Sequence, residues 1–365
     1  MMTRASGPLK GVRVIEFAGL GPGPFAGMML SDMGAEILRI DRKSAGKVGP
    51  ERTIHARGGR SLALDLKEQN DVDLCLRLCD RAEIIFEGNR PGVMERLGLG
   101  PDILLARNPK LVYGRITGWG QSGPLARTAG HDINYLAVTG ALHAIGPKEK
   151  PIVPLNLLGD YGGGSMFLVT GILAALSHAR ATGEGQIVDA AMTDGASYLM
   201  TLFYGMLADG LWQDRRGDNL LDGGMPFYDT YCCADGLWIS IGALEPEFYA
   251  TLLELTDLRE RLPQAQFDPK GWNDMRQAFC KRFLSKTRKE WCDLLGGTDV
   301  CFAPVLSLSE APQSPHNKAR ATFMEFDGVI QPAPAPRFSK TPSRARSNRA
   351  DFDDTREHIL TDWCM

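Results

Sequence analysis

The feature that most constrains this chain is a repeated alternation between short apolar runs and helical patterns in its first half. The first run, Val12 to Phe17, ends in the glycine-rich segment Ala18 to Gly23. Further apolar runs follow at 37–40, 61–64, 83–86 and 111–116. Helical patterns cover 24–33, 71–81 and 102–107. Strands that alternate with helices pair in parallel, so the sequence predicts an α/β fold with a large, Rossmann-like parallel sheet.

The pattern changes after residue 160, where long helical stretches at 171–180 and 190–207 enclose a short β-rich run at 187–188. Two later runs, 228–231 and 237–241, flank the turn signal Ala234-Asp235-Gly236 and predict a hairpin that begins a smaller α+β domain. We therefore predict a large domain over 1–200, a linker helix region over 201–227, a small domain over 228–305, and a return segment over 306–365 that completes the large domain and ends in a tail.

Composition narrows the class of partner. The chain has 41 Lys+Arg and 44 Asp+Glu, a net charge of −3, which lacks the basic field that nucleic-acid binding needs. No run of about 18 apolar residues and no apolar signal-peptide core is evident, so we expect no membrane contact and a cytoplasmic protein. The eight cysteines show no C-x-x-C spacing, so neither a metal site nor a disulfide framework is expected.

The glycine-rich segment after the first run imitates a dinucleotide-binding loop, with Asp41 about 20 residues beyond Gly21. Pro22 and Pro24 remove two backbone N–H donors, and the G-x-G-x-x-G spacing is absent. Nicotinamide binding is therefore disfavoured. Three basic residues cluster at the end of the next run: Arg39, Arg42 and Lys43. This cluster suits phosphate groups, and a solvated strand end explains it equally well.

Three polar residues lie at points where the pattern predicts a helix to begin. His131 follows a glycine-rich loop, Asp160 precedes Tyr161-Gly162-Gly163-Gly164, and Glu245 lies between a strand end and a new helix. Taken singly, the histidine is typical of a structural residue and the two carboxylates of helix caps.

Taken together with the N-terminal segment, they resemble the α-methylacyl-CoA racemases, a branch of the family III CoA-transferase superfamily, from about Gly7 to about Pro342. So long an ordered series of matching segments makes the resemblance specific. In chain order the segments are Gly11 to Glu16, Gly21 to Pro24, Arg39 to Arg42, Arg90 to Val93, Ala129 to Tyr135, Asn156 to Asp160, Val188 to Met192, and Glu245-Pro246.

The resemblance implies an interlocked homodimer whose active site lies between the large domain of one subunit and the small domain of the other. His131 and Asp160 match the catalytic pair, and Asn156 and Glu245 match their supports. Coenzyme A belongs to the substrate, so no separate cofactor is implied. The positions that match coenzyme A contacts are Arg39, Leu64, Asp65, Leu66, Lys67, Arg90, Gly130, Asp132, Ile133, Asn134 and Tyr135.

The residue types fit inversion at the α-carbon of a 2-methylacyl-CoA thioester. Neutral His131 would remove the α-hydrogen on one face while protonated Asp160 supplies a proton on the other, and the roles reverse for the opposite enantiomer. Burial and a hydrogen bond with Asn156 would help Asp160 to hold that proton. Backbone N–H groups at 160–163 would face the thioester oxygen.

Two alternatives remain. In a family III CoA transferase, the matching Asp160 attacks an acyl-CoA as a nucleophile. A non-catalytic CoA-binding protein would keep the fold without the chemistry. Deuterium incorporation at the α-carbon without an acceptor acid indicates a racemase, whereas acceptor-dependent exchange of CoA indicates a transferase.

Overall fold

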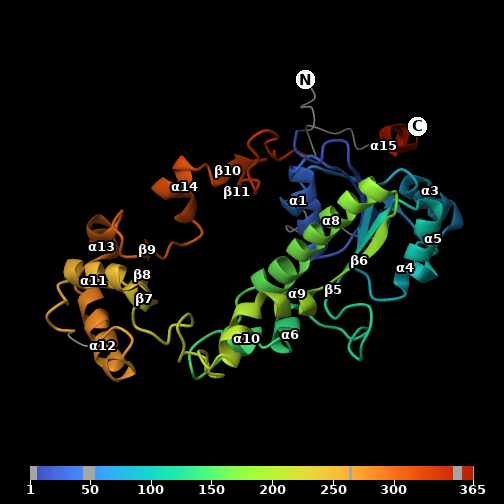
Figure 1. Cartoon of the computed structure of the whole chain (residues 1–365). Helices are drawn as coiled ribbons and strands as arrows, with labels where there is room; N and C mark the ends of the chain where they lie inside the picture. Colours follow the sequence, from blue (N-terminus) through green and yellow to red (C-terminus); the bar gives the residue numbers. More distant parts are fainter. Residues whose placement is uncertain (1–5, 44–53, 263–264, 348–355, 365) are drawn as a thin grey trace. The chain divides into compact units, whose positions relative to one another are not determined.

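The structure is a computed structural model that describes residues 6–43, 54–262, 265–347 and 356–364 (Figure 1). Its contacts divide the chain into two compact units. The first unit takes in the residues up to 141, residues 154–200 and the residues from 321 onward, and the second takes in 142–153 and 201–320. This division differs from the predicted domain boundaries at 142–153 and 306–320, which group with the second unit.

A six-stranded sheet forms the centre of the first unit, and all of its neighbouring strands are parallel. The strand order β3-β2-β1-β4-β5-β6 is the doubly wound arrangement, so the predicted α/β fold is confirmed. The strands are β1 (Arg13–Phe17), β2 (Glu36–Arg42), β3 (Gly59–Leu64), β4 (Ile84–Glu87), β5 (Val112–Thr117) and β6 (Gln186–Ala191).

Both faces of this sheet are buried, which explains the nearly continuous apolar runs. Along β1 the side chains alternate, with Val14 in the core on one face and Ile15 in the core on the other. The first core includes residues of α1 (Pro22–Asp32) and α8 (Met166–Thr182), and the second includes residues of α3 (Gln69–Cys79), α4 (Val93–Arg96), α5 (Pro101–Arg107) and α15 (Arg356–Cys364).

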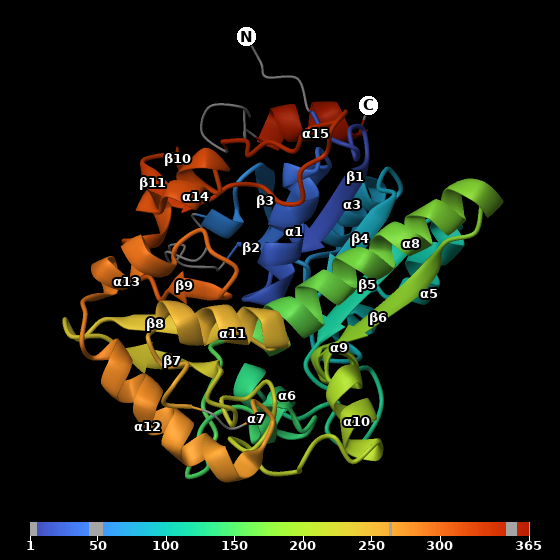
Figure 2. The ribbon, with the colours of Figure 1, turned by 60° about the vertical axis from the view of Figure 1, so that its left-hand side comes forward.

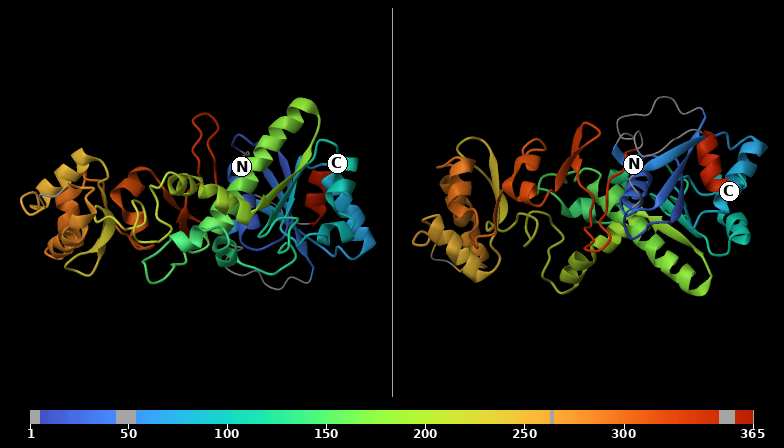
Figure 3. Two further views of the ribbon diagram at one scale, coloured as in Figure 1. Left: turned by 60° about the horizontal axis from the view of Figure 1, so that its bottom comes forward. Right: turned by 90° about the horizontal axis from the view of Figure 1, so that it is seen from above.

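The C-terminal part of the chain belongs to the first unit. Trp363 of α15 is buried, and α15 lies beside α3 in both views of Figure 3. The strands β10 (Phe323–Phe326) and β11 (Val329–Pro332) form a hairpin, and its Gln331 accepts a hydrogen bond from Arg57 at 2.6 Å. Arg57 also pairs with Asp32 in the interior, so it anchors the hairpin and does not present its charge to a phosphate.

The second unit is built on an antiparallel sheet of β7 (Tyr228–Cys232), β8 (Trp238–Gly242) and β9 (Phe302–Pro304). The hairpin predicted over 228–241 is confirmed by the pairing of β7 with β8. Three helices pack with this sheet (Figure 2): α11 (Pro246–Leu255), α12 (Trp272–Phe283) and α13 (Arg288–Leu295). Their core is aromatic, with Phe227, Phe279, Phe283 and Trp291 fully buried.

A continuous helical segment runs from η1 (Leu157–Ser165), which is a π-helix, into α8. Its 26 residues are long and apolar enough to cross a membrane, and it is the one such candidate among the residues that the structure describes. Half of its most apolar 18-residue stretch is buried, and Leu168, Ile172 and Leu176 pack into the core over the sheet. The segment has the packing of a core helix.

Candidate active site

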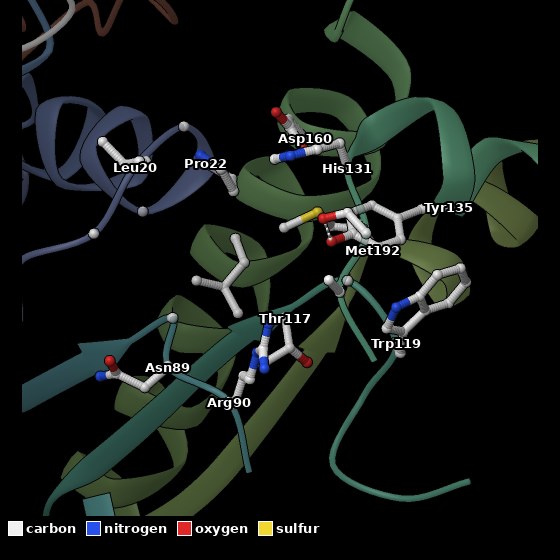
Figure 4. Close-up of a pocket in the computed structure, with 18 of the residues that line it drawn as sticks. Leu20, Pro22, Asn89, Arg90, Thr117, Trp119, His131, Tyr135, Asp160 and Met192 are labelled. Atoms are coloured by element: carbon white, nitrogen blue, oxygen red, sulfur yellow. Dashed lines mark hydrogen bonds between the residues drawn. The ribbon is translucent and has the colours of Figure 1, made fainter. Parts of the chain in front are cut away.

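The strand order reverses between β1 and β4, and in doubly wound sheets ligands bind at the carboxyl ends of the strands at this switch point. A pocket of about 760 Å³ lies there (Figure 4), and we call it the His131/Asp160 pocket. Residues 19–23 after β1, 88–91 after β4 and 117–119 at the end of β5 line it. Asp160 and residues near the start of α6 (Asp132–Ala137) complete it.

His131 is the N-cap residue of α6, and its side chain is exposed on the pocket wall. Its backbone N–H donates to Asn134 Oδ1 at 3.0 Å. Tyr135 donates its hydroxyl proton to the Gly130 carbonyl at 2.5 Å and packs edge-on against Trp119. Burial, with a smaller effect of Asp160, raises the pKa of Tyr135, which keeps that donor protonated. The backbone around His131 is therefore fixed, and the residue is exposed on the pocket wall.

Asp160 lies inside the first turn of the π-helix η1, whose N-cap is Asn156. The helix-cap interpretation of Asp160 is therefore wrong. The expected partner is in place, since Asn156 Nδ2 donates to Asp160 Oδ2 at 3.2 Å. Gly163 allows α9 (Met192–Leu199) to approach η1 closely, because a Cβ there would lie 2.6 Å from the backbone nitrogen of Ala196. π-Helical turns are rare and occur frequently at functional sites.

The backbone of Asp160 is used differently from the expectation. Its N–H donates to Asp132 Oδ1 at 2.7 Å, so this donor is not available to a thioester oxygen. The prediction that the backbone N–H groups of residues 160–163 face the thioester oxygen is therefore wrong for Asp160. Its N–H is bound by the Asp132 side chain, which comes from a neighbouring helix.

A second pocket of about 670 Å³ lies at the ends of β2 and β3, and we call it the Lys67 pocket. Residues 41–43 and 64–67 line it, and it shares Phe17 and Asn89 with the His131/Asp160 pocket. Lys43 is held at 2.6 Å from Asp71, which also accepts the backbone N–H of Asp65 at 2.8 Å. Cations at a strand-end pocket suit phosphate groups.

Most of the expected site residues lie in these two pockets. The His131/Asp160 pocket brings together His131, Asp160, Asn156, Arg90, Gly130, Asn134 and Tyr135. The Lys67 pocket contains Leu64, Asp65, Leu66 and Lys67. Asp132, Ile133 and Arg39 line neither pocket.

Arg39 is buried and makes a bidentate ion pair with Glu16, at 2.9 and 3.0 Å. The two residues are direct partners across β1 and β2. The guanidinium group is thus committed to the sheet interior, and the structure does not bring it to a coenzyme A site.

Glu245 belongs to the second unit, where it is the N-cap residue of α11, and it does not line the His131/Asp160 pocket. The loop that carries it is held by the buried side chain of Gln266. Its Nε2 donates to the carbonyls of Ala243 and Leu244 at 2.8 and 2.9 Å. This network fixes the backbone from which Glu245 projects.

The sequence interpretation missed Glu87 and Asn89. Glu87 is buried at the carboxyl end of β4 and accepts the backbone N–H of Asn89 at 2.6 Å. Burial raises its pKa to about 7, and the hydrogen bond from Asn89 and the charge of Arg115 oppose that rise. The sequence did contain a signal for Glu87, which is an acidic residue at the carboxyl end of an apolar run. In a parallel sheet, ligands bind at the carboxyl ends of the strands.

The sequence comparisons agree with this architecture. Residues 9–350 match CoA-transferase family III, and the chain belongs to this family. It is 46% identical to the alpha-methylacyl-CoA racemase of Mus musculus, over 93% of this chain and 89% of that protein. It is 43% identical to the human alpha-methylacyl-CoA racemase, over 97% of this chain and 93% of that protein. A CaiB/BaiF family protein from Brucella suis has the same fold, with a TM-score of 0.84 over 98% of this chain and 100% of that chain at 24% identity.

Proposed function

We propose that this protein interconverts the two enantiomers of 2-methyl-branched acyl-CoA thioesters by transfer of the α-proton. One observation carries the proposal: the fold brings a solvent-accessible histidine and a half-buried aspartate, His131 and Asp160, into one pocket at the switch point of the sheet. The high identity to two alpha-methylacyl-CoA racemases over nearly the full chain supports it.

The reaction needs one group that removes a proton and another that returns one. In one direction the His131 imidazole takes the α-hydrogen, the electron pair of the C–H bond moves into the thioester to form an enolate, and Asp160 donates its proton to the opposite face. In the other direction the carboxylate takes the proton and the imidazolium donates. The amide of Asn156 orients the carboxyl group through its 3.2 Å hydrogen bond.

The coenzyme A part of the substrate would extend from the His131/Asp160 pocket into the Lys67 pocket. The two pockets share Phe17 and Asn89, so a single ligand can follow their common wall. Arg90 in the first pocket and Lys67 in the second supply positive charge for the phosphates.

The active form would be a homodimer in which Glu245 of one subunit supports the His131 imidazolium of the other. Exposed apolar side chains in each unit support an association: Leu155 and Tyr198 of the first unit are 70% and 71% exposed, and Leu211 of the second is 69% exposed. Co-expression of His131→Ala and Glu245→Ala chains tests this. Shared sites predict that the mixed dimer regains activity that each variant lacks alone, and no regain contradicts them.

Incorporation of solvent deuterium at the α-carbon of a 2-methylacyl-CoA, measured by mass spectrometry without an acceptor acid, tests the reaction. The wild-type protein should label both enantiomers, and His131→Ala should lose roughly 10²–10⁴-fold of the rate. His178→Ala, which removes an exposed histidine on α8, is the matched control and should retain the wild-type rate.

CoA transfer gives the opposite result in the same assay. If the wild-type protein incorporated no deuterium but moved CoA to an added carboxylic acid, Asp160 would act as a nucleophile and the racemase proposal would be wrong. If it did neither but still bound a CoA thioester, the protein would be a binding module.

A further inference from the structure

The side chain of Asp132 connects the two segments that carry His131 and Asp160. Asp132 directly follows His131, and its Oδ1 accepts the backbone N–H of Asp160 at 2.7 Å. Resting on the proposed function, we propose that Asp132 is a positioning residue that sets the place of Asp160 relative to His131. It would act through Asp160 and would not itself touch the substrate.

The π-helix explains why Asp160 needs this partner. The first N–H groups of any helix have no partner within the helix, and the wider i→i+5 pattern of a π-helix leaves one more without a partner than an α-helix does. Asp160 is the fourth residue of η1, so its N–H is among them. A carboxylate is the strongest acceptor a side chain offers to such a group. Asp132 therefore holds the end of the helix from which the Asp160 carboxyl group projects.

The rest of η1 is held by close backbone packing. A Cβ on Gly195 of α9 would lie 1.9 Å from the Gly163 carbonyl oxygen, and the Ser165 hydroxyl donates to the Pro22 carbonyl at 2.8 Å. Gly159 lets Asp132 approach, because a Cβ there would lie 2.4 Å from Asp132 Oδ1. Because these contacts hold the C-terminal part of η1, we infer that the Asp132 contact sets the position of its N-terminal turn.

The environment of Asp132 is costly for a carboxyl group, which argues for a specific role. The residue is 7% exposed, and its Oδ2 has no hydrogen-bond partner among the described residues. Burial raises the pKa of Asp132, and the N–H groups of Asp160 and Gly159 oppose the rise only in part. Asp132 also lines neither pocket, so its carboxylate is not placed as a coenzyme A contact.

A simpler role is stabilisation of α6, since acidic residues in the first turn of a helix interact favourably with its dipole. The two roles predict different kinetics. His131 is held by the Asn134 side chain, independently of the Asp132 carboxylate. Loss of Asp132 should therefore displace Asp160 more than His131, and the two enantiomers should be affected unequally. A helix stabiliser would affect both enantiomers equally.

The test measures deuterium incorporation from each enantiomer of a 2-methylacyl-CoA separately, in Asp132→Ala and Asp132→Asn. Asp132→Ala should lower kcat by about 10²-fold, the loss that a shift of roughly 1 Å in a reacting group causes, with KM within about twofold of wild type. Asn keeps an acceptor oxygen for the Asp160 N–H, so Asp132→Asn should stay within about tenfold of wild type.

The matched control is Asp222→Asn in the second unit. Asp222 likewise accepts backbone N–H groups, from Gly217 at 2.8 Å and Asn219 at 2.9 Å, and lies in neither pocket. The Asp222→Asn variant should therefore have the wild-type kcat for each of the two enantiomers. If Asp132→Ala does not fold, Gly159→Ala replaces it, because the added methyl group displaces the Asp132 oxygen while both carboxylates remain; it should lower kcat unequally for the two enantiomers.

Three outcomes would overturn the inference: a folded Asp132→Ala protein with wild-type kcat, one in which only KM rises, or equal losses for both enantiomers. Failure of the proposed function is distinguishable, because it appears in the wild-type protein as absence of deuterium incorporation. A wild-type protein that incorporates deuterium, beside an equally active Asp132→Ala variant, rejects only the role of Asp132.

Discussion

The two pockets at the carboxyl ends of the sheet differ in how their polar groups are held. In the His131/Asp160 pocket, the backbone N–H groups of His131 and Asp160 donate to side-chain oxygens of Asn134 and Asp132. Glycines there allow close backbone contacts that leave no space for a Cβ. The Lys67 pocket carries exposed strand-end cations such as Lys67, and its Lys43 pairs with the Asp71 side chain. The first arrangement suits chemistry, which requires precise placement, and the second suits anchoring, which tolerates movement.

The largest effect expected from this comparison is at Asp160. Asp160→Ala should lower kcat for α-deuterium incorporation by roughly 10³-fold for the enantiomer whose α-hydrogen Asp160 removes, and leave KM nearly unchanged, because a fixed acid–base group contributes to the transition state and not to ground-state binding. Steady-state kinetics on each enantiomer measures this. Asp102→Ala, an exposed aspartate in the first turn of α5, should behave as wild type. A rise in KM alone would make Asp160 an anchoring residue.

The next effect concerns the wall that the pockets share. Glu87 holds Asn89, and burial raises the pKa of Glu87 from 4.5 to about 7. Between these values the folded state binds more protons than the unfolded state, so this group lowers stability as pH rises through the window. In the wild type, this group should lower the free energy of unfolding by about 3 kcal/mol as pH rises from 4.5 to 7. Glu87→Gln should remove this pH-dependent loss, and its amide oxygen still accepts the Asn89 N–H.

Urea unfolding of wild type and Glu87→Gln at pH 4.5 and pH 7.5 measures this effect. The free energy of unfolding of Glu87→Gln, relative to that of wild type, should be larger at pH 7.5 than at pH 4.5. An equal difference between the two proteins at both pH values would mean that folding does not raise the pKa of Glu87.

The smallest effect is expected in the Lys67 pocket. Lys67→Ala should raise KM for the CoA thioester by about tenfold with kcat unchanged, since one exposed cation adds modest phosphate affinity. The difference should shrink as salt is added. Lys110→Ala, an exposed lysine just before β5, serves as the control. A fall in kcat instead of a rise in KM would erase the distinction between the two pockets.

The sequence predicted the fold well because the signals were local. The apolar runs mark β1 to β6 to within a few residues, and the hairpin of β7 and β8 follows from Ala234-Asp235-Gly236. The order of motifs led to His131 and Asp160, which lie in one pocket, although neither residue is distinctive alone. Their roles in proton transfer stay a prediction.

Local sequence patterns could not predict which residues pair with partners far away in the chain. Arg39 looked like a phosphate ligand because it lies in a basic cluster, but the register of β1 and β2 places it against Glu16. The pairing of Arg57 with Asp32, 25 residues away, is a second contact of this kind. The sequence predicted only that a helix begins near Asp160, and the structure has a π-helix over 157–165. Gly163 and Gly195 allow this helix and α9 to approach more closely than side chains permit.

The sequence by itself thus determined the parallel α/β architecture and the identity of the polar residues around the site, since apolar periodicity and ordered motifs are properties of the chain. Only the tertiary structure decided which of those residues face a ligand. Ion pairs between strands and a carboxylate that binds the backbone of another segment depend on register and packing, which bring together residues far apart in the chain. Asp132 shows the difference: the motif suggested a coenzyme A contact, and the fold directs its carboxylate to the backbone of Asp160.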